Sequence, residues 1–255
     1  MCNSGMGQMK IDGCVALVTG GNRGLGKAYV EGLLAAGAAK VYAAARTPDH
    51  VAADPRVEPV RLDVTAPADI AAAAARCADA TLLINNAGVL LNSPMLADGA
   101  AEAIRREMEV NVFGMQAMIA AFAPLLARNG GGAVVNMLSV ASWITNPFIA
   151  TYCASKHAAL AVSDAARIQL AQQGTRVVGV YAGFIDTEMA AAVDRPKTPP
   201  GQVVERTLDG LRRKIDHVFA DDRAERVWRA TRHQPEMLAA DQLRDWEAGA
   251  SPWKN

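Results

Sequence analysis

The chain has 255 residues, 51% of them hydrophobic, with 26 Lys and Arg against 26 Asp and Glu. This hydrophobic content can fill a core and excludes general disorder, while the zero formal net charge argues against nucleic acid or an anionic membrane as the main partner. No apolar run suggests a signal peptide or a membrane span, so we expect a cytoplasmic protein. The four cysteines are scattered without metal-ligand spacing, which predicts reduced thiols and no metal site.

Short apolar segments alternate with longer helical ones along most of the chain. The predicted strands are Val15–Thr19, Val41–Ala45, Val57–Leu62, Thr81–Ile84, Ala133–Leu138 and Arg176–Tyr181. The predicted helices are Ala28–Ala36, Pro67–Cys77, Glu102–Arg128 and Thr151–Gln173. This alternation builds parallel βαβ units, so we expect an α/β fold with a doubly wound parallel sheet in three α/β/α layers, as a single domain.

The two ends of the chain depart from this alternation. Residues 1–12 form an N-terminal tail, and a Pro-rich stretch from Arg195 to Gly201 indicates a loop inserted near the end. Residues 221–255 are rich in charge and carry three tryptophans, which predicts a C-terminal extension of amphipathic helices. We expect this extension to pack on the body of the protein or on a neighbouring subunit.

The turn after the first strand reads Gly20-Gly21-Asn22-Arg23-Gly24-Leu25-Gly26. Glycines between a strand and a helix let backbone N–H groups and the positive helix end hold a phosphate. The structural alternative is a tight turn that needs glycine only for its backbone shape. Gly21–Lys27 also nearly matches the phosphate loop of nucleoside triphosphatases, but position 28 is Ala where that loop needs a Ser or Thr for magnesium, which disfavours this alternative.

The end of the second strand bears on the choice of cofactor. It reads Ala44-Ala45-Arg46, without the carboxylate that binds the adenosine ribose in NAD-dependent dinucleotide folds. Arg46 can pair with a 2′-phosphate, and Arg23 in the glycine turn is a candidate second cation. These residues predict NADP(H) rather than NAD(H); solvated surface arginines are the structural alternative.

A tyrosine and a lysine stand where they can do proton chemistry. Tyr152 and Lys156 are four residues apart at the start of a predicted helix, which places them on one face. A nearby cation favours the phenolate and lowers the pKa of the tyrosine, making it a general acid or base. Ser139 follows the preceding strand and can donate a hydrogen bond to a substrate oxygen. Cys153 and His157 are also four apart but lack a third orienting group, so a cysteine hydrolase is not expected.

In this order, the motifs resemble those of the classical short-chain dehydrogenase/reductase family. The residues Thr19–Gly26 read TGxxxGxG, Asn85–Gly88 read NNAG and Tyr152–Lys156 read YxxxK, and the likeness runs from about Cys14 to Thr187. The resemblance implies a Rossmann-type fold and an oxidoreductase that moves a hydride between NADP(H) and a carbonyl or secondary alcohol. It also implies a homodimer or homotetramer, assembled through the helices Glu102–Arg128 and Thr151–Gln173.

The resemblance assigns roles to individual residues. It implies a catalytic tetrad in which Tyr152 transfers the proton and Ser139 orients the carbonyl, while Lys156 binds the nicotinamide ribose and tunes the tyrosine. Asn111 supports a water relay. The implied cofactor contacts are Gly20, Asn22, Arg23, Gly24, Leu25, Gly26, Arg46, Asp63, Val64, Asn86, Ala87, Gly88, Tyr152, Lys156, Ile185 and Thr187.

One departure from the family pattern concerns the loop after the sixth strand. The family has Pro-Gly where this chain has Ala182-Gly183, and loss of the proline frees a backbone torsion and restores an N–H. We therefore expect a nicotinamide loop that is looser or differently set. The resemblance places substrate selectivity after Ser139 and in residues 188–202, a substrate loop or lid. Trp143, Phe148 and Phe184 are candidates for an aromatic pocket wall, and a place in the core or at a subunit interface is the alternative for each.

Two other functions remain open on the same fold. One is a catalytically idle module that binds or senses NADP(H), against which the complete tetrad argues. The other is an isomerase or dehydratase that retains its cofactor and therefore produces no net change in nicotinamide absorbance. The substrate of the favoured reaction is a small molecule whose identity is not encoded in these motifs.

Overall fold

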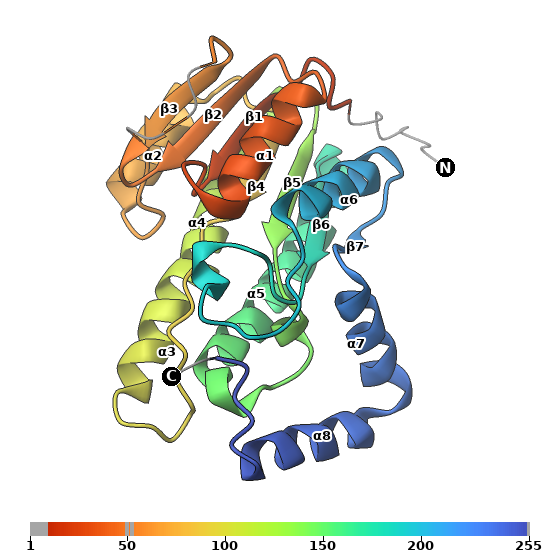
Figure 1. The fold of residues 1–255 in the computed structure, drawn as a ribbon. Helices are drawn as coiled ribbons and strands as arrows, with labels where there is room; N and C mark the ends of the chain where they lie inside the picture. The colour runs from red at the N-terminus through yellow and green to blue at the C-terminus, as the bar shows by residue number, and fades with distance from the viewer. Residues whose placement is uncertain (1–9, 49–50, 52–53, 254–255) are drawn as a thin grey trace.

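The computed structural model describes residues 10–48, 51 and 54–253, so most of the predicted N-terminal tail lies outside the described residues. Its centre is a parallel sheet of seven strands in the order β3-β2-β1-β4-β5-β6-β7 (Figure 1). The order reverses between β1 and β4, as in a doubly wound Rossmann-type fold, which confirms the predicted fold class. The strands are β1 (Val15–Thr19), β2 (Lys40–Ala45), β3 (Val57–Arg61), β4 (Leu82–Asn85), β5 (Ala133–Met137), β6 (Arg176–Tyr181) and β7 (His217–Phe219).

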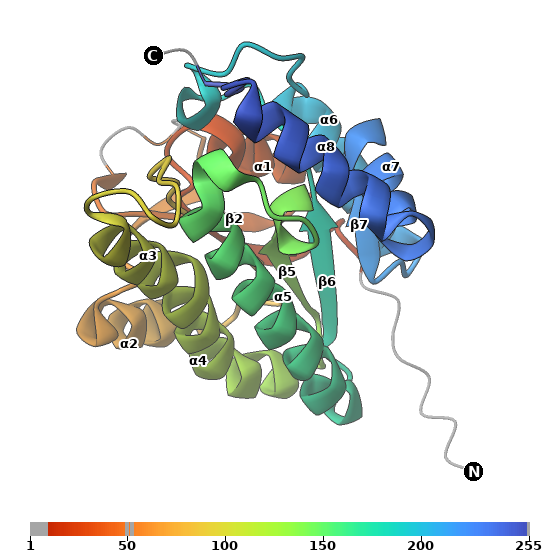
Figure 2. The same cartoon turned by 90° about the horizontal axis from the view of Figure 1, so that it is seen from below.

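Helices cover both faces of the sheet (Figures 1 and 2). One face carries α1 (Gly24–Ala35) and α6 (Pro200–Arg212), and the other carries α2 (Pro67–Arg76), α4 (Met115–Arg128) and α5 (Ala150–Leu170). The remaining helices are α3 (Ala100–Met108), α7 (Asp222–His233) and α8 (Pro235–Glu247).

The strands are apolar runs because the helices bury them from both sides. Tyr29 and Leu33 of α1 pack in the core on one face, and Phe122 and Leu126 of α4 pack in the core on the other. Helices α1 and α6 approach closely at Gly32, where a Cβ atom would lie 2.4 Å from Val204 Cγ1. These two cores fix the strand ends that carry the candidate site residues.

The predicted helix Glu102–Arg128 is interrupted in the structure. A π-helical turn, Glu109–Gly114, separates α3 from α4. Gly114 packs so closely on Val64 that a Cβ atom would lie 2.8 Å from its Cγ2 atom, so a tertiary contact accompanies the change in helix type. By length and composition alone, Ala100–Arg128 could cross a membrane, but half of its apolar window is buried here, with α4 packed between α2 and α5.

Two elements were not predicted from the sequence. The helix α6 begins at Pro200, inside the segment expected to be a loop, and uses that proline in its first turn. The strand β7 has three residues and pairs with β6 at the edge of the sheet. The predicted helices of the C-terminal extension are present as α7 and α8, and Asp221 caps α7 by accepting the Ala224 N–H at 2.7 Å.

Candidate active site

The candidate residues converge at the carboxyl ends of the parallel strands. Ser139 lies just beyond β5, and the first turns of α5 carry Tyr152 and Lys156. Asn111 lies in the π-helical turn between α3 and α4. The glycine turn follows β1 at the same edge of the sheet. In doubly wound folds ligands bind at this edge, where the strand order reverses.

Ser139 is held rigidly at the start of a short 3-10 turn, Val140–Ser142. Its Oγ atom accepts the Ala141 N–H at 3.1 Å, and its own N–H donates to Ser142 Oγ at 3.3 Å. The Ser139 hydroxyl donates to the Ala182 carbonyl at 3.4 Å and lies near enough to the Tyr152 hydroxyl to lower the pKa of that phenol. This arrangement places two hydroxyl groups side by side where a substrate oxygen could meet both.

The tyrosine titrates differently from the sequence-based expectation. Burial raises the pKa of Tyr152, and the nearby Cys153 adds to the effect, while the hydrogen bond with Ser139 only partly opposes it. Lys156 Nζ lies 5.6 Å from the centre of the tyrosine ring and donates to the Met137 carbonyl at 2.9 Å. Burial lowers the pKa of Lys156 from 10.5 to about 8. In the protein without cofactor, burial therefore affects the pKa values of Tyr152 and Lys156 more than their proximity to each other does.

Asn111 ties the loop after β4 to helix α5. Its Nδ2 atom donates to the Val89 carbonyl at 2.9 Å and to Ser155 Oγ at 3.0 Å, and its Oδ1 atom accepts the Val89 N–H at 2.9 Å. A π-helical turn inside a longer helix often marks a functional site, because it offsets the residues that follow. Here it places the Asn111 amide against the backbone next to Gly88. Its part in a water relay stays a prediction.

The glycine turn forms a cradle that side chains would fill. Gly20 and Gly24 have φ of 68° and 50°, and a Cβ atom on Gly26 would lie 1.9 Å from the Gly20 carbonyl oxygen. In the described chain no side-chain hydrogen bond caps the start of α1, so its first N–H groups are available to a ligand. A turn without side chains lets the backbone approach a ligand closely, and its N–H groups without side-chain partners fit the pyrophosphate of a dinucleotide.

The turn is also joined to the adjacent NNAG segment. Thr19 Oγ1 accepts the N–H groups of Asn86 and Ala87, both at 2.9 Å, and Asn86 Nδ2 donates to the Thr19 carbonyl at 2.9 Å. These bonds lock the ends of β1 and β4 together at the point where the strand order reverses. The predicted contacts Gly20, Asn86 and Ala87 therefore share one rigid unit.

The two candidate arginines have different surroundings. Arg46 is exposed at the end of β2 and forms no ion pair with any described residue. Arg23, by contrast, pairs with Glu188 of the segment after β6, and both side chains are exposed. Arg46 thus has no ion-pair partner among the described residues, although its charge acts on the nearby Asp63 carboxylate, whereas Arg23 joins the glycine turn to the predicted substrate loop.

Other predicted cofactor contacts lie along the same edge. Asn22 Nδ2 donates to the Thr47 carbonyl at 3.3 Å. Asp63 accepts the Thr65 N–H at 2.9 Å and the Thr65 hydroxyl at 2.7 Å, and these bonds lower the pKa of Asp63. Val64 is buried beside Asp63. Leu25 is buried on the inner face of α1.

A family model described as short chain dehydrogenase matches residues 14–198. The chain belongs to the short-chain dehydrogenase family. The resemblance seen in the sequence is thereby confirmed. Among solved structures, the fold is similar to a short chain dehydrogenase from Burkholderia cenocepacia J2315 in complex with NADP, with a TM-score of 0.89 and 42% identity over 92% of this chain and 99% of that chain.

Curated relatives of this short-chain dehydrogenase are also enzymes. Galactitol 2-dehydrogenase from Agrobacterium fabrum is 31% identical over 196 residues, covering 73% of this chain and 76% of that protein. The 2-(R)-hydroxypropyl-CoM dehydrogenase from Xanthobacter autotrophicus is 34% identical over 199 residues, covering 72% of this chain and 79% of that protein. The chain is thus similar to oxidoreductases that act on different substrates.

The loop after β6 is firmly anchored in this short-chain dehydrogenase, contrary to the looser loop expected from Ala182. The Gly183 N–H donates to Asp221 Oδ2 at 2.7 Å, and the same oxygen accepts the Thr198 hydroxyl at 3.1 Å. Ile185 forms a β-bridge with Thr198. The carboxylate of Asp221 therefore takes over the restraint that a proline ring would provide. The position of Asp221 just before α7 predicts a helix cap, but no local sequence pattern predicts its contact with Gly183.

Thr187 brings the same loop close to the cradle. Its Cγ2 atom lies 3.4 Å from where a Cβ atom on Gly24 would be, and its hydroxyl donates to the Ile185 carbonyl at 3.4 Å. Thr187 thus lies beside the glycine turn, and Ile185 is held next to it by the same loop. Their contact with a nicotinamide remains a prediction.

The predicted aromatic wall is only partly assembled. Phe148 lies 5.1 Å from Trp246 and Phe184 lies 5.6 Å from Trp253, measured between ring centres. Trp143 instead stacks on Tyr181 at 4.0 Å, away from that pair of contacts. The two tryptophans come from the C-terminal extension, which therefore covers the body of this subunit beside the candidate site. Both tryptophans are far from the tetrad in sequence, so the motifs did not predict that they lie beside the site.

Glu107 is a further buried group that the motifs did not reveal. Its Oε1 atom accepts the Leu91 N–H at 2.8 Å, which holds the segment after NNAG against α3. The side chain is completely buried, and burial raises its pKa. It fixes backbone near the site and does not point to a reaction of its own.

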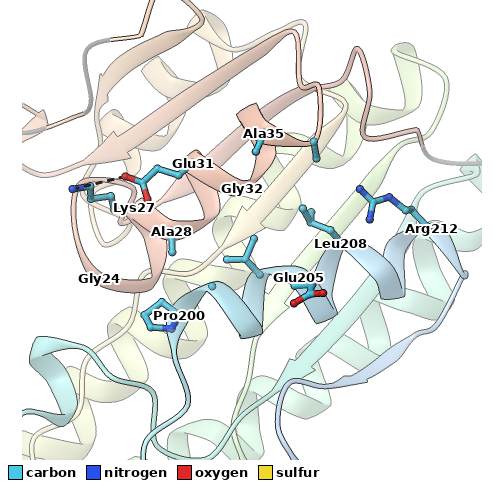
Figure 3. Close-up of a pocket in the computed structure, with 13 residues that line it drawn as sticks. Gly24, Lys27, Ala28, Glu31, Gly32, Ala35, Pro200, Glu205, Leu208 and Arg212 are labelled. Carbon is cyan, nitrogen blue, oxygen red and sulfur yellow. Dashed lines mark ion pairs between the residues drawn. The ribbon is translucent and has the colours of Figure 1, made fainter.

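A groove also lies outside the tetrad. Figure 3 shows it between α1 and α6, where the small side chains of α1 leave space and the Lys27–Glu31 ion pair lies to one side. Of the predicted site residues it includes only Gly24. It is lined by Gly24, Lys27, Ala28, Glu31, Gly32, Ala35, Ala36, Pro200, Gly201, Val204, Glu205, Leu208 and Arg212.

Proposed function

We propose that this short-chain dehydrogenase is an NADP(H)-dependent oxidoreductase that interconverts a carbonyl and a secondary alcohol, with Tyr152 as the general acid and base. The observation that carries the proposal is the grouping of Tyr152, Ser139 and Lys156 at the strand ends next to the glycine cradle. A hydroxyl that can lose its proton, a second hydroxyl and a buried amine are what carbonyl reduction requires of the protein.

The protein residues divide the proton chemistry among them. NADP(H), when bound, supplies or takes up the hydride. In the reducing direction, Ser139 donates a hydrogen bond to the substrate oxygen and Tyr152 passes its proton to it. The ammonium of Lys156 stabilises the phenolate that remains, which compensates for the burial that raises the pKa of Tyr152. Asn111 keeps the neighbouring backbone in place through Val89.

The choice of NADP(H) is supported by the charge at the end of β2. Arg46 is an exposed cation without a described ion-pair partner, and Ala45 precedes it where an acidic residue would repel a phosphate. Arg23 is engaged by Glu188, so Arg46 carries the larger part of the proposed 2′-phosphate recognition. The similar structure from Burkholderia cenocepacia is a complex with NADP, which supports the same choice.

A panel of ketones, aldehydes and quinones assayed with NADPH tests the reaction class. We expect loss of nicotinamide absorbance together with formation of the alcohol or quinol product. Substrate turnover without net change in absorbance would instead indicate an isomerase or dehydratase. Tight NADPH binding without turnover of any compound would indicate a binding module, so each alternative has its own result.

The proposed assembly is a homodimer or homotetramer formed through Glu102–Arg128, which spans α3, the π-helical turn and α4, and through Thr151–Gln173, which is largely α5. Two large apolar side chains on this side of the subunit are exposed, Phe113 at 53% and Ile168 at 77%. Burial of such side chains between subunits would stabilise the assembly. A cytoplasmic location stays a prediction from the sequence.

A further inference from the structure

The last described residues, 248–253, which we call the C-terminal strap, return from α8 to the candidate active site (Figures 1 and 2). Val193 and Trp253 form an antiparallel β-bridge, and the Asp194 N–H donates to the Pro252 carbonyl at 2.9 Å. Trp253 and Tyr152 both pack against one small apolar cluster of Ala141, Ile149 and Cys153. The strap lies beyond the part of the chain matched by the family model.

Trp253 carries a hydrogen-bond donor that has no acceptor. Its Nε1 atom is buried and has no partner among the described residues. An indole N–H can only donate, and a buried donor without an acceptor is costly, so such groups in proteins usually meet a partner. Because Trp253 and Tyr152 border the same apolar cluster, we infer that the missing acceptor belongs to a molecule bound at the candidate site.

Arg223 is a second donor without an acceptor in the same neighbourhood. It lies in the first turn of α7, partly buried, with its guanidinium carbon 4.9 Å from the centre of the Phe184 ring. Its aliphatic stem packs on Gly183, where a Cβ atom would lie 2.7 Å from Arg223 Cδ. Among the described residues it forms no hydrogen bond or ion pair.

The carboxylates near Arg223 act on it through space and do not accept a hydrogen bond from it. Both oxygens of Asp221 accept hydrogen bonds from other groups, one from Ala224 and the other from Gly183 and Thr198. Asp245 of α8 is exposed and forms no ion pair with Arg223, and Arg195 and Arg226 oppose the two carboxylates. The N–H donors of the Arg223 guanidinium are therefore available to a bound acceptor.

Phe184 brings the two donors together. Its ring meets Trp253 edge to face at 5.6 Å and Arg223 at 4.9 Å, and it follows the anchored Gly183 directly. We propose that the substrate is a carbonyl compound bearing a carboxylate, and that Arg223 and the Trp253 indole N–H bind this carboxylate while Tyr152 meets the carbonyl. This inference rests on the proposed function. A guanidinium fork matches a carboxylate, and the aromatic rings exclude water from the pair.

Binding of a matched acid and amide to the NADPH-loaded enzyme tests the proposal. Phenylacetate and phenylacetamide have nearly the same shape and differ in charge, and isothermal titration measures both. We expect the acid to bind at least roughly tenfold more tightly, the gain typical of one charged hydrogen bond. Arg223→Gln should remove that preference, and Trp253→Phe, which keeps a ring but loses the N–H, should reduce it.

Two control variants separate recognition from structure. Arg226→Gln removes an exposed arginine of the same helix and should leave the acid preference intact. Asp245→Asn should also leave it intact; if Arg223 served only to hold α8 through Asp245, this variant would reproduce the effect of Arg223→Gln. Equal binding of acid and amide by the native protein, including binding of neither, would overturn the proposal, as would an acid preference that survives Arg223→Gln.

The titration also keeps the two proposals apart. NADPH affinity is measured first, and turnover of the carbonyl panel is measured separately. An enzyme that oxidises NADPH with neutral ketones but shows no acid preference contradicts only the carboxylate inference. A protein that binds NADPH and prefers the acid but turns over no carbonyl compound contradicts only the proposed reaction.

Discussion

Replacement of Lys156 by Met should make the cofactor-free protein more stable near neutral pH while removing its activity. Lys156 is 6% exposed, and burial lowers its pKa from 10.5 to about 8. A difference of this size corresponds to roughly 3 kcal/mol of unfavourable burial below the folded pKa. The substitution also leaves the Met137 carbonyl without its donor, which costs about 1 to 2 kcal/mol. We therefore expect a net gain of roughly 1 to 2 kcal/mol in the free energy of unfolding.

The pH dependence gives this prediction its sharpest test. Between pH 8 and 10.5 the unfolded chain keeps the Lys156 proton that the folded protein has lost, so the native protein gains stability as the pH rises through this range. The advantage of Lys156→Met should shrink by roughly 3 kcal/mol over the same range. Urea unfolding of both proteins without cofactor, near neutral pH and near the upper end of this range, measures the change.

A matched control removes a lysine that is not buried. Lys27→Met on α1 takes away a side chain with 54% exposure that pairs with Glu31, and it should shift stability little. The free energies of unfolding of Lys156→Met and the native protein should differ by an amount that changes with pH. A difference that is constant with pH would contradict this prediction, because it would show that the ammonium of Lys156 carries no burial penalty.

Two further variants probe the cofactor site and the loop beside it. Arg46→Asp should weaken NADPH binding by roughly tenfold or more and leave NADH binding nearly unchanged, measured by fluorescence titration; equal losses for both cofactors would count against recognition of the 2′-phosphate. Asp221→Ala removes a helix cap and the acceptor for Gly183 and Thr198, so it should lower the free energy of unfolding by roughly 2 to 4 kcal/mol in urea denaturation. A loss well under 1 kcal/mol would show that the loop does not depend on this carboxylate.

The sequence was most informative where a pattern has a local physical cause. Strands buried on both faces read as apolar runs, and the glycine cradle reads as glycine because a side chain on Gly26 would collide with Gly20. The grouping of Tyr152 and Lys156 follows from helical spacing. Each of these signals depends on residues that are close together in sequence, so the doubly wound fold and the position of the candidate site could be predicted.

Features that depend on distant contacts could not be predicted in this way. The π-helical turn before Gly114 accompanies close packing against Val64, which no local pattern encodes. The strap pairs with the segment after β6 and brings Trp253 to the apolar cluster on which Tyr152 also packs, and the loop at Ala182 is held by Asp221, the cap of a later helix. The expected loosening of that loop considered only the missing proline. The restraint came instead from a carboxylate that is remote in sequence.

The pKa of Tyr152 and the position of Trp143 differ from expectation for a similar cause. The spacing of Tyr152 and Lys156 correctly placed the amine near the ring, but spacing does not report how deeply both groups are buried, and burial dominates the pKa of each. Trp143 follows Ser139 closely in sequence, yet the chain directs its ring onto Tyr181 at 4.0 Å. Proximity in sequence was a poor guide to which aromatic rings face the site.

Replacement of Tyr152 by Phe tests the central claim most directly, because it removes one hydroxyl and keeps the ring. NADPH affinity and the rate of NADPH-dependent carbonyl reduction are measured on the same preparation, with the native protein alongside. We expect Tyr152→Phe to bind NADPH with nearly native affinity and to lose at least roughly a hundredfold in turnover. Turnover that persists near the native rate in Tyr152→Phe would show that this hydroxyl is not the proton donor and would contradict the proposed reaction.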